Sequence, residues 1–173
     1  MGSDHPVRLR QAVPADADLL DAWHTPEFLG DFNQFGVSFE PMRQAIERTG
    51  LLGEHGGQLI IETAAGEPVG TVSWHAVRYG PNPESTALNV GINLIPSARG
   101  RGLGAVAQRL LVEYLFARTS ANRIEAMTDV DNVAEQRSLE KAGFVREGVA
   151  IGAQFRAGAW HDLVVYSAVR PAG

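Results

Sequence analysis

The sequence contains no cysteine among its 173 residues. This absence excludes disulfide bonds, thiolate metal sites and a cysteine nucleophile. An apolar run of the roughly 20 residues that a membrane-spanning helix needs is also missing. The opening segment, MGSDHPVRLR, lacks the apolar stretch of a secretory signal. We therefore expect a cytoplasmic protein that has no membrane partner.

A surplus of positive charge is missing too, because 15 lysines and arginines stand against 20 acidic residues and give a net charge of −5. Nonspecific nucleic-acid binding needs a basic face, so no nucleic-acid partner is expected. Internal repeats, low-complexity tracts and linkers are absent as well. At this length we expect a single domain over residues 1–173, as a monomer or a homodimer.

Hydrophobic periodicity predicts an alternation of strands and helices along the chain. Strands are predicted at 7–12, 58–63, 69–77, 86–95, 123–129, 144–155 and 160–169, and helices at 14–24, 40–49, 103–115 and 132–143. Residues 25–39 are irregular and rich in phenylalanine, which fits either a flap over a pocket or a short helical piece on the core. Strands in hairpin order, mixed with two strand–helix–strand crossovers, predict a mixed α/β sheet.

A glycine-rich turn, Arg99-Gly100-Arg101-Gly102-Leu103-Gly104, lies between a predicted strand and a predicted helix. Glycines let the backbone approach a ligand closely, and a helix N-terminus attracts negative charge. The turn therefore predicts a site for a phosphate-bearing cofactor. The nucleoside-triphosphate pattern G-x-x-x-x-G-K-[ST] is absent. Gly100-x-Gly102-x-x-Ala105 fits a dinucleotide fingerprint, but three strands in hairpin order precede it, which a doubly wound sheet would not have.

The spacing Arg99-x-x-Gly102-x-Gly104 resembles the [RQ]-x-x-G-x-[GA] pattern of the GNAT N-acetyltransferase superfamily. Further segments resemble its RimJ/RimL-like branch, in the same order along the chain: Val7–Arg10 with Asp16, GINLIPSARGRGLG at 91–104, NVAEQRSLEKAGF at 132–144 and FRAGAWHDLVVYSAVR at 155–170. The resemblance implies a GNAT-like fold, with a central mixed seven-stranded sheet and helices on both faces. It also implies acetyl-CoA as the donor and a primary amine as the acceptor, either a small molecule or a peptide or protein N-terminus.

The resemblance further implies which residues bind the cofactor. The pyrophosphate would rest on backbone N–H groups of Arg99, Gly100, Arg101, Gly102, Leu103, Gly104 and Ala105, and the two arginine side chains would add charge. The pantetheine arm would pair with the backbone of Ile92, Asn93, Leu94 and Ile95, where two strands splay apart. Asn132 would hold that arm, although its position also fits a plain helix cap with Glu135. No metal is expected.

Direct attack of the amine on the thioester is expected, since there is no cysteine to carry the acetyl group. This attack requires a neutral amine, a donor to the developing oxyanion and a proton for the departing thiolate. A backbone N–H near Asn93 could serve as that donor if its strand is bulged. The glutamate, tyrosine and serine that the resemblance implies are replaced by Asn89, Leu139 and Glu135. The usual groups that move protons are therefore missing.

The remaining candidates for proton transfer are His75, Glu84, and a water chain that ends at Asn89 or Ser138, beside the closing residues His161, Asp162 and Tyr166. A substrate pocket is expected between residues 25–39, the loop 78–85 and the turn 156–158, with Phe32, Phe35, Trp74 and Trp160 able to line it. Two other classes stay open at this point. One is a coenzyme-A-binding module without catalysis, and the other is an NAD(P)-dependent oxidoreductase.

Overall fold

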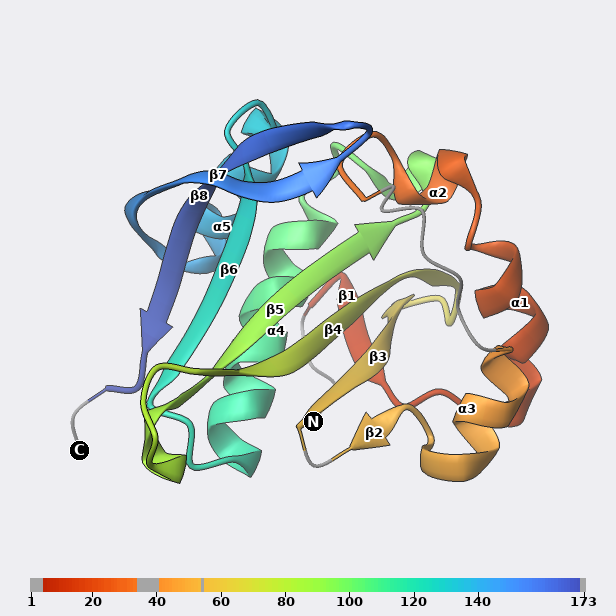
Figure 1. Ribbon diagram of the computed structural model, residues 1–173. Coiled ribbons are helices and arrows are strands. Elements are labelled where there is room, and N and C mark those ends of the chain that lie inside the picture. The colour runs from red at the N-terminus through yellow and green to blue at the C-terminus, as the bar shows by residue number, and fades with distance from the viewer. Residues whose placement is uncertain (1–4, 34–40, 54, 172–173) are drawn as a thin grey trace.

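The computed structural model describes residues 5–33, 41–53 and 55–171, and it shows a mixed, twisted sheet with helices packed against it (Figure 1). The strands lie in the order β1-β3-β4-β5-β6-β8-β7, and β2 pairs with β3 outside this path. Their bounds are β1 (Val7–Arg10), β2 (Leu52–Gly53), β3 (Gly56–Thr63), β4 (Pro68–Arg78), β5 (Thr86–Leu94), β6 (Arg123–Asp129), β7 (Val145–Arg156) and β8 (Ala159–Val169). The predicted mixed sheet is confirmed, and β2 is a strand that the sequence did not predict.

The helices are α1 (Ala17–Ala22), α2 (Pro26–Leu29), α3 (Met42–Thr49), α4 (Leu103–Arg118) and α5 (Val133–Ala142), with short 3-10 turns η1 (Pro14–Asp16), η2 (Pro83–Ser85) and η3 (Pro96–Ala98). None of the helices in the described part of the chain is both long and apolar enough to cross a bilayer. Part of the irregular segment at 25–39 forms α2, while Phe35 and its neighbours at 34–39 lie outside the described residues.

The helix predicted at 14–24 is wrong in detail, because the structure divides it into η1 and α1. Asp16 does not cap α1 with its side chain. Its carboxylate accepts a hydrogen bond of 2.8 Å from the backbone N–H of Val13 and two from the Arg10 guanidinium. A strong ion pair within reach thus competes with the capping role that local sequence suggests.

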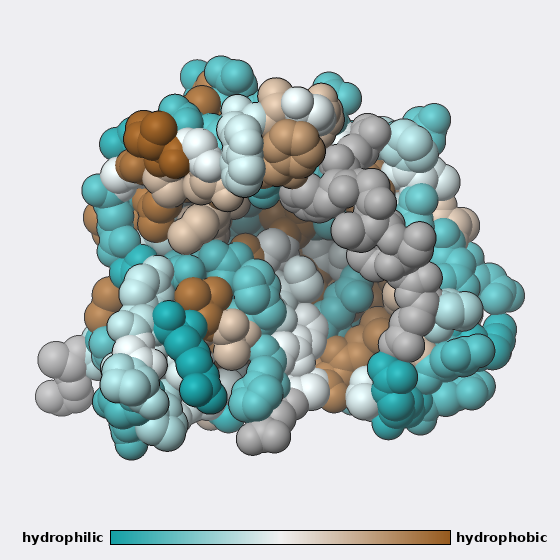
Figure 2. Space-filling model, viewed as in Figure 1, coloured by the Kyte–Doolittle hydropathy of each residue, from teal (hydrophilic) through white to brown (hydrophobic). Residues whose placement is uncertain are grey.

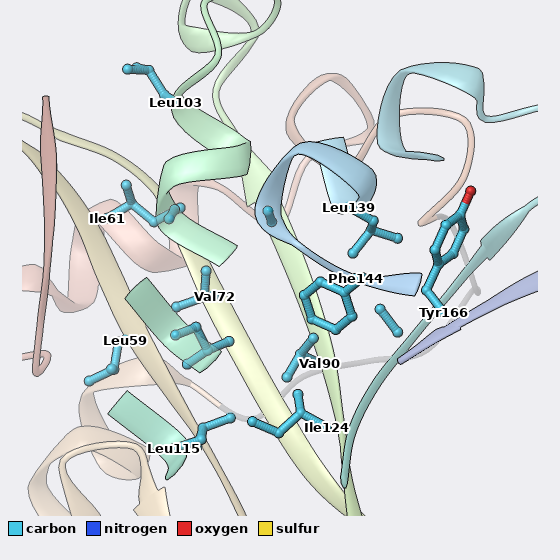
Figure 3. Packing of buried hydrophobic residues seen from close by; sticks show 14 of the residues in the cluster. Leu59, Ile61, Val72, Val90, Leu103, Leu115, Ile124, Leu139, Phe144 and Tyr166 are labelled. Atoms are coloured by element: carbon cyan, nitrogen blue, oxygen red, sulfur yellow. The ribbon is translucent and has the colours of Figure 1, made fainter. Parts of the chain in front are cut away.

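Alternate residues of β3 explain why helices cover both faces of the sheet. Ile61 belongs to the main core with Leu111 and Leu115 of α4, whereas Ile60 belongs to a second cluster with residues of α1 and α3. Figure 3 shows the main core between α4, α5 and the strands. Because successive strand residues point to opposite faces, one strand supports both clusters, and the predicted placement of helices on both faces is confirmed.

The pairing between β5 and β6 is parallel and very short, and this creates the site. It covers Leu88 with Ile124, Asn89 with Glu125 and Val90 with Ala126, and then stops. On its other side β5 stays paired with β4 as far as Leu94. The two strands therefore diverge toward their C-terminal ends, as Figure 1 shows. The backbone edge of β5 beyond Val90 is left without a strand partner on the β6 side.

A surface ion pair ties β6 to the β7–β8 hairpin and gives a pH-dependent prediction. Arg123 donates two hydrogen bonds of 2.6 Å to the Glu147 carboxylate, and the Ser167 hydroxyl donates a third of 2.6 Å. These bonds hold the pKa of Glu147 at about 2, below its usual 4.5. Because the folded-state pKa is lowered, the stabilisation is present above pH 4.5 and is lost as pH falls toward about 2.

We expect Glu147→Gln to lower the melting temperature near neutral pH by at most about 2–4 °C, since a half-exposed pair is worth about 1 kcal/mol or less. The difference from the parent protein should shrink to nothing as pH falls through the acid range. Thermal unfolding followed by circular dichroism over that range measures it. A difference that stays constant at every pH would contradict this assignment.

Candidate active site

A cavity of about 700 Å³ opens between the end of β5, the glycine-rich turn, α5 and the segment that begins with α2. The sequence-predicted residues that line it are Ile92, Asn93, Leu94, Arg99, Gly100, Gly102, Leu103, Gly104, Ala105, Asn132 and Ser138. Ile95 is absent from this wall and packs against the hydrophobic clusters instead. Arg101 is exposed and does not line the cavity. The fold thus brings most of the predicted cofactor residues onto one surface.

The turn before α4 depends on glycine at two kinds of position. Gly100 and Gly102 have φ angles of 70° and 77°, which L side chains rarely adopt. A Cβ on Gly104 would lie 3.1 Å from the Ser138 hydroxyl oxygen, so this glycine lets α4 and α5 approach closely. Gly102 is the N-terminal cap of α4, and the first N–H groups of a helix have no partner within the helix. This end of α4 can therefore receive an anionic group.

The Arg99 side chain has a role that the sequence did not predict. Its Nε donates to the Leu94 carbonyl at 3.0 Å, and its Nη2 donates to the carbonyls of Glu27, at 3.2 Å, and Phe28. Carbonyl groups at a helix C-terminus lack helical partners and attract cations. Arg99 therefore fastens α2 beside β5 and helps to build the cavity wall.

Two basic residues of α5 also line the cavity and were missed at the sequence level. Arg137 and Lys141 are exposed and four residues apart, so they lie on one side of the helix. The opposite side buries Leu139 and Ala142 in the core. The spacing of Leu139 and Ala142 could have indicated Arg137 and Lys141 from the sequence, because it places these two basic residues on the side of α5 that faces away from the core.

A smaller cavity of about 110 Å³ lies where β5 and β6 diverge. Its wall includes Val90, Gly91 and Ile92 from β5 and Ala126, Met127, Thr128 and Asp129 from β6. It shares Phe32, Asn33, Ile92, Asn132 and Glu135 with the larger cavity. The two cavities therefore adjoin and run from the glycine turn into the gap between the strands.

A bulge near Asn93 was the condition for its backbone N–H to serve as oxyanion donor, and the ladder between β5 and β4 contains none. Every residue of both strands is described, and the register runs one to one from Gly70–Leu94 to Arg78–Thr86. The Asn93 side chain instead accepts a hydrogen bond of 3.0 Å from the Asn33 amide. Asn93 thus holds the loop after α2 against β5, at the junction of the two cavities.

The Asn132 side chain caps α5, as its sequence position predicted. Its Oδ1 accepts from the backbone N–H of Glu135 at 3.3 Å. The cap uses the oxygen, so the NH₂ group is the part of this side chain that can donate to a ligand. The Glu135 carboxylate accepts a hydrogen bond from the Gln108 amide.

The structure separates the four candidates for proton transfer. Ser138 lines the larger cavity, and its hydroxyl donates to Gln108 Oε1 at 2.9 Å. His75 and Glu84 are exposed, and neither lines either cavity. Asn89 also lies off both cavities, and its Nδ2 donates to Glu125 Oε1 at 3.3 Å. Of the four, Ser138 alone stands beside the predicted cofactor site.

Glu125 is fully buried next to Asn89 on β6. It accepts from the Tyr79 hydroxyl at 2.5 Å and from Arg123 Nε at 3.1 Å. The bond to Glu125 is the main cause that raises the pKa of Tyr79. The loop after β4 therefore covers a satisfied buried carboxylate, and it does not border either cavity as the sequence analysis expected.

The closing hairpin contributes Gln154 and Leu163 to the wall of the smaller cavity, whereas the turn 156–158, which was expected to form a pocket wall, lines neither cavity. The hairpin also holds a buried ion pair. Arg156 pairs with Asp129, and His161 Nδ1 lies 3.2 Å from the same carboxylate. Asp162 accepts from the backbone N–H of Gly152 at 2.7 Å and so orders β7. Tyr166 is fully buried, and burial is the main cause that raises its pKa.

Phe32 is the one expected aromatic residue that lines a cavity within the described residues, and it lines both. Trp74 packs against Tyr114 with ring centroids 5.9 Å apart. Trp160 is exposed and meets Phe155 edge to face at 5.4 Å. These two tryptophans therefore serve packing or surface contacts and lie outside both cavities.

Comparison with known proteins identifies the family. The sequence profile described as "Acetyltransferase (GNAT) domain" matches residues 7–145. An uncharacterized N-acetyltransferase, YoaA of Bacillus subtilis, is 31% identical over 105 residues, covering 61% of this chain and 57% of that relative, so the match spans little more than half of its length.

Two solved structures share the fold at low sequence identity. A spermidine N-acetyltransferase SpeG chimera from Vibrio cholerae and hSSAT superposes with a TM-score of 0.78 at 18% identity, covering 95% of this chain and 96% of that one. A ribosomal-protein-S5-alanine acetyltransferase from Vibrio fischeri gives 0.76 at 20% identity, over 97% and 95%. With the profile matching well over half of its length, the chain belongs to the GNAT acetyltransferase family.

Proposed function

We propose that this chain is an acetyl-CoA-dependent N-acetyltransferase of the RimJ/RimL-like branch, acting as a single domain that transfers the acetyl group directly to a primary amine. The observation that carries the proposal is the continuous path from the glycine turn, through the larger cavity, into the gap between β5 and β6. Coenzyme A has phosphates at one end and a thioester at the other, and this path offers a fitting environment to each. Family membership supports the same reaction.

The residues present fit the cofactor. The start of α4 and the basic side chains of Arg137 and Lys141 would bind phosphate oxygens. The unpaired edge of β5 beyond Val90 would pair with the amide groups of the pantetheine arm, as an added strand does. The Asn132 amide would donate to the same arm. When bound, the cofactor supplies the activated acetyl group.

The acceptor would approach from the face of the sheet opposite α4. Figure 2 shows this face hollowed near its centre, below the β7–β8 hairpin. Solved structures with this fold include enzymes named for spermidine and for ribosomal proteins. We propose a primary amine as the acceptor, on a small molecule or on a peptide or protein N-terminus. The cytoplasmic location and the monomeric or dimeric state stay predictions.

The proposed phosphate contacts give a prediction about binding. We expect Arg137→Ala with Lys141→Ala to raise the KM for acetyl-CoA about tenfold and to leave kcat within about twofold, since each lost charge-assisted contact costs about 0.7 kcal/mol at a solvent-exposed site. Steady-state kinetics at low and high salt measure this, and the effect should be larger at low salt. Arg109→Ala is the matched control, because Arg109 is exposed on α4 and lines neither cavity. An unchanged KM would contradict these contacts.

A thiol-release assay with acetyl-CoA and a panel of amines and peptides tests the proposed function. We expect release with at least one acceptor, together with measurable acetyl-CoA binding by calorimetry. Tight binding without release for any acceptor would favour a module that has lost catalysis. Thermal stabilisation by NAD(P)H, without stabilisation by acetyl-CoA, would favour an oxidoreductase and overturn the proposal.

A further inference from the structure

Glu135 stands at the junction of the two cavities. Five residues in the described part of the chain line both cavities, and Glu135 is the only ionisable one among them; the others are Phe32, Asn33, Ile92 and Asn132. In the proposed reaction the phosphates lie toward the glycine turn and the acetyl group lies toward the gap between β5 and β6. A side chain at the junction would therefore lie close to the thioester of the bound cofactor.

A buried relay fixes the Glu135 carboxyl in this position. Gln108 of α4 is 2% exposed, and its amide nitrogen donates to Glu135 Oε1. The other end of the same amide, Oε1, accepts from the Ser138 hydroxyl at 2.9 Å. The Gln108 side chain therefore bonds to both Glu135 and Ser138, and it is too deeply buried to turn toward solvent. This arrangement fixes one oxygen of the carboxyl of a residue that lines both cavities.

The surroundings keep a proton available at this carboxyl. Burial raises the pKa of Glu135 to about 7, and the hydrogen bond from Gln108 opposes this only in part. The other charged residues that line the two cavities are Glu27, Asp31 and Arg99 in the larger one, Arg137 and Lys141 on the same helix as Glu135, and Asp129 in the smaller one. Asp129 is already paired with Arg156, and Arg99 is bound to carbonyls.

We propose that Glu135 is the proton donor to the departing coenzyme A thiolate, an assignment that rests on the proposed function. The amine nitrogen bonds to the acetyl carbon, the C–S bond breaks, and its electron pair goes to sulfur. The proton of the Glu135 carboxyl passes to that sulfur and gives the free thiol. The carboxylate then takes a proton from water. Water in turn accepts the proton that the amine nitrogen loses. Protons and electrons therefore balance without a further reactant.

The test is Glu135→Gln, which keeps the shape and the contact with Gln108 but has no acidic proton. We expect kcat to fall about 100-fold, in the range for general acid catalysis. The KM for acetyl-CoA should stay within about threefold. The parent kcat should decline as pH rises through the pKa of Glu135, and this decline should be absent in the variant. Glu135→Asp keeps the acidic group and should retain more of kcat than Glu135→Gln.

Glu113→Gln is the matched control, because Glu113 is exposed on α4 and lines neither cavity. It makes the same change in charge and should leave kcat and the pH profile unchanged. Parent-like kcat and pH dependence in Glu135→Gln would overturn this inference alone, as would a loss confined to KM. If the parent protein binds acetyl-CoA yet releases no thiol with any amine, the proposed function fails first and this inference fails with it. Thermal unfolding of each variant separates loss of fold from loss of chemistry.

Discussion

Gly102→Val is expected to reduce acetyl-CoA binding by about 100-fold or more while the chain still folds. Gly102 caps α4 with a φ of 77° and lines the larger cavity. A Cβ there meets no protein atom within 4 Å, so a side chain would occupy the open space in which the cofactor phosphates are proposed to lie. It would also bias the backbone away from the conformation that presents the first N–H groups of α4.

The backbone cost of a non-glycine residue in this conformation is about 1–2 kcal/mol, and it must be separated from the effect on binding. Gly66 offers the matched control, since it has a φ of 86°, meets nothing within 4 Å and lies in the turn between β3 and β4. Gly66→Val should cost similar stability and leave binding unchanged. Calorimetric titration with acetyl-CoA, together with thermal unfolding, measures both. Normal binding by Gly102→Val would place the cofactor elsewhere.

Elements marked by local signals were predicted well from the sequence. β6 has the predicted bounds, and α5 begins at the Asn132 cap and ends at Gly143, whose φ is 97°. In both cases the periodicity and the residues at the ends act over a few positions. The division of residues 14–24 into η1 and α1 was not predicted in this way, and Asp16 bonds to Arg10 with its side chain instead of capping α1.

In the site, too, features set by neighbouring residues could be predicted, and contacts between distant residues could not. The glycine turn could be predicted because its conformational demands are local, and the splaying of β5 from β6 entered only through the family resemblance. The bond of Arg99 to Phe28 joins positions 71 residues apart, and the bond of Arg156 to Asp129 joins positions 27 apart. A single sequence does not show which of many distant partners a charged side chain meets. Glu135 departs from the family pattern, and its place at the junction of the cavities follows only from the structure.

Arg156→Ala is expected to produce the largest loss of stability. Both partners of this ion pair are buried, with Arg156 6% and Asp129 3% exposed. Removing one partner of a buried charge pair costs about 3–5 kcal/mol, and the Asp129 carboxylate would then keep His161 Nδ1 and the Asp131 N–H as partners. For a chain of this size, that loss lowers the melting temperature by about 10 °C or more. Denaturant unfolding measures the change, and Arg109→Ala, at an exposed position, should stay within about 0.5 kcal/mol of the parent.

The same substitution should also weaken catalysis, since Arg156 joins the hairpin to the loop after α2. Its Nη1 donates to the Asp31 carbonyl at 2.6 Å, and its guanidinium lies 5.3 Å from the centre of the Phe32 ring, which lines both cavities.

We expect a double-mutant cycle with Asp129→Asn to show that the two losses of stability are not additive, because either change alone removes the same direct contact. Additive losses, or a loss below about 1 kcal/mol for Arg156→Ala, would show that the pair does not hold the hairpin to the sheet.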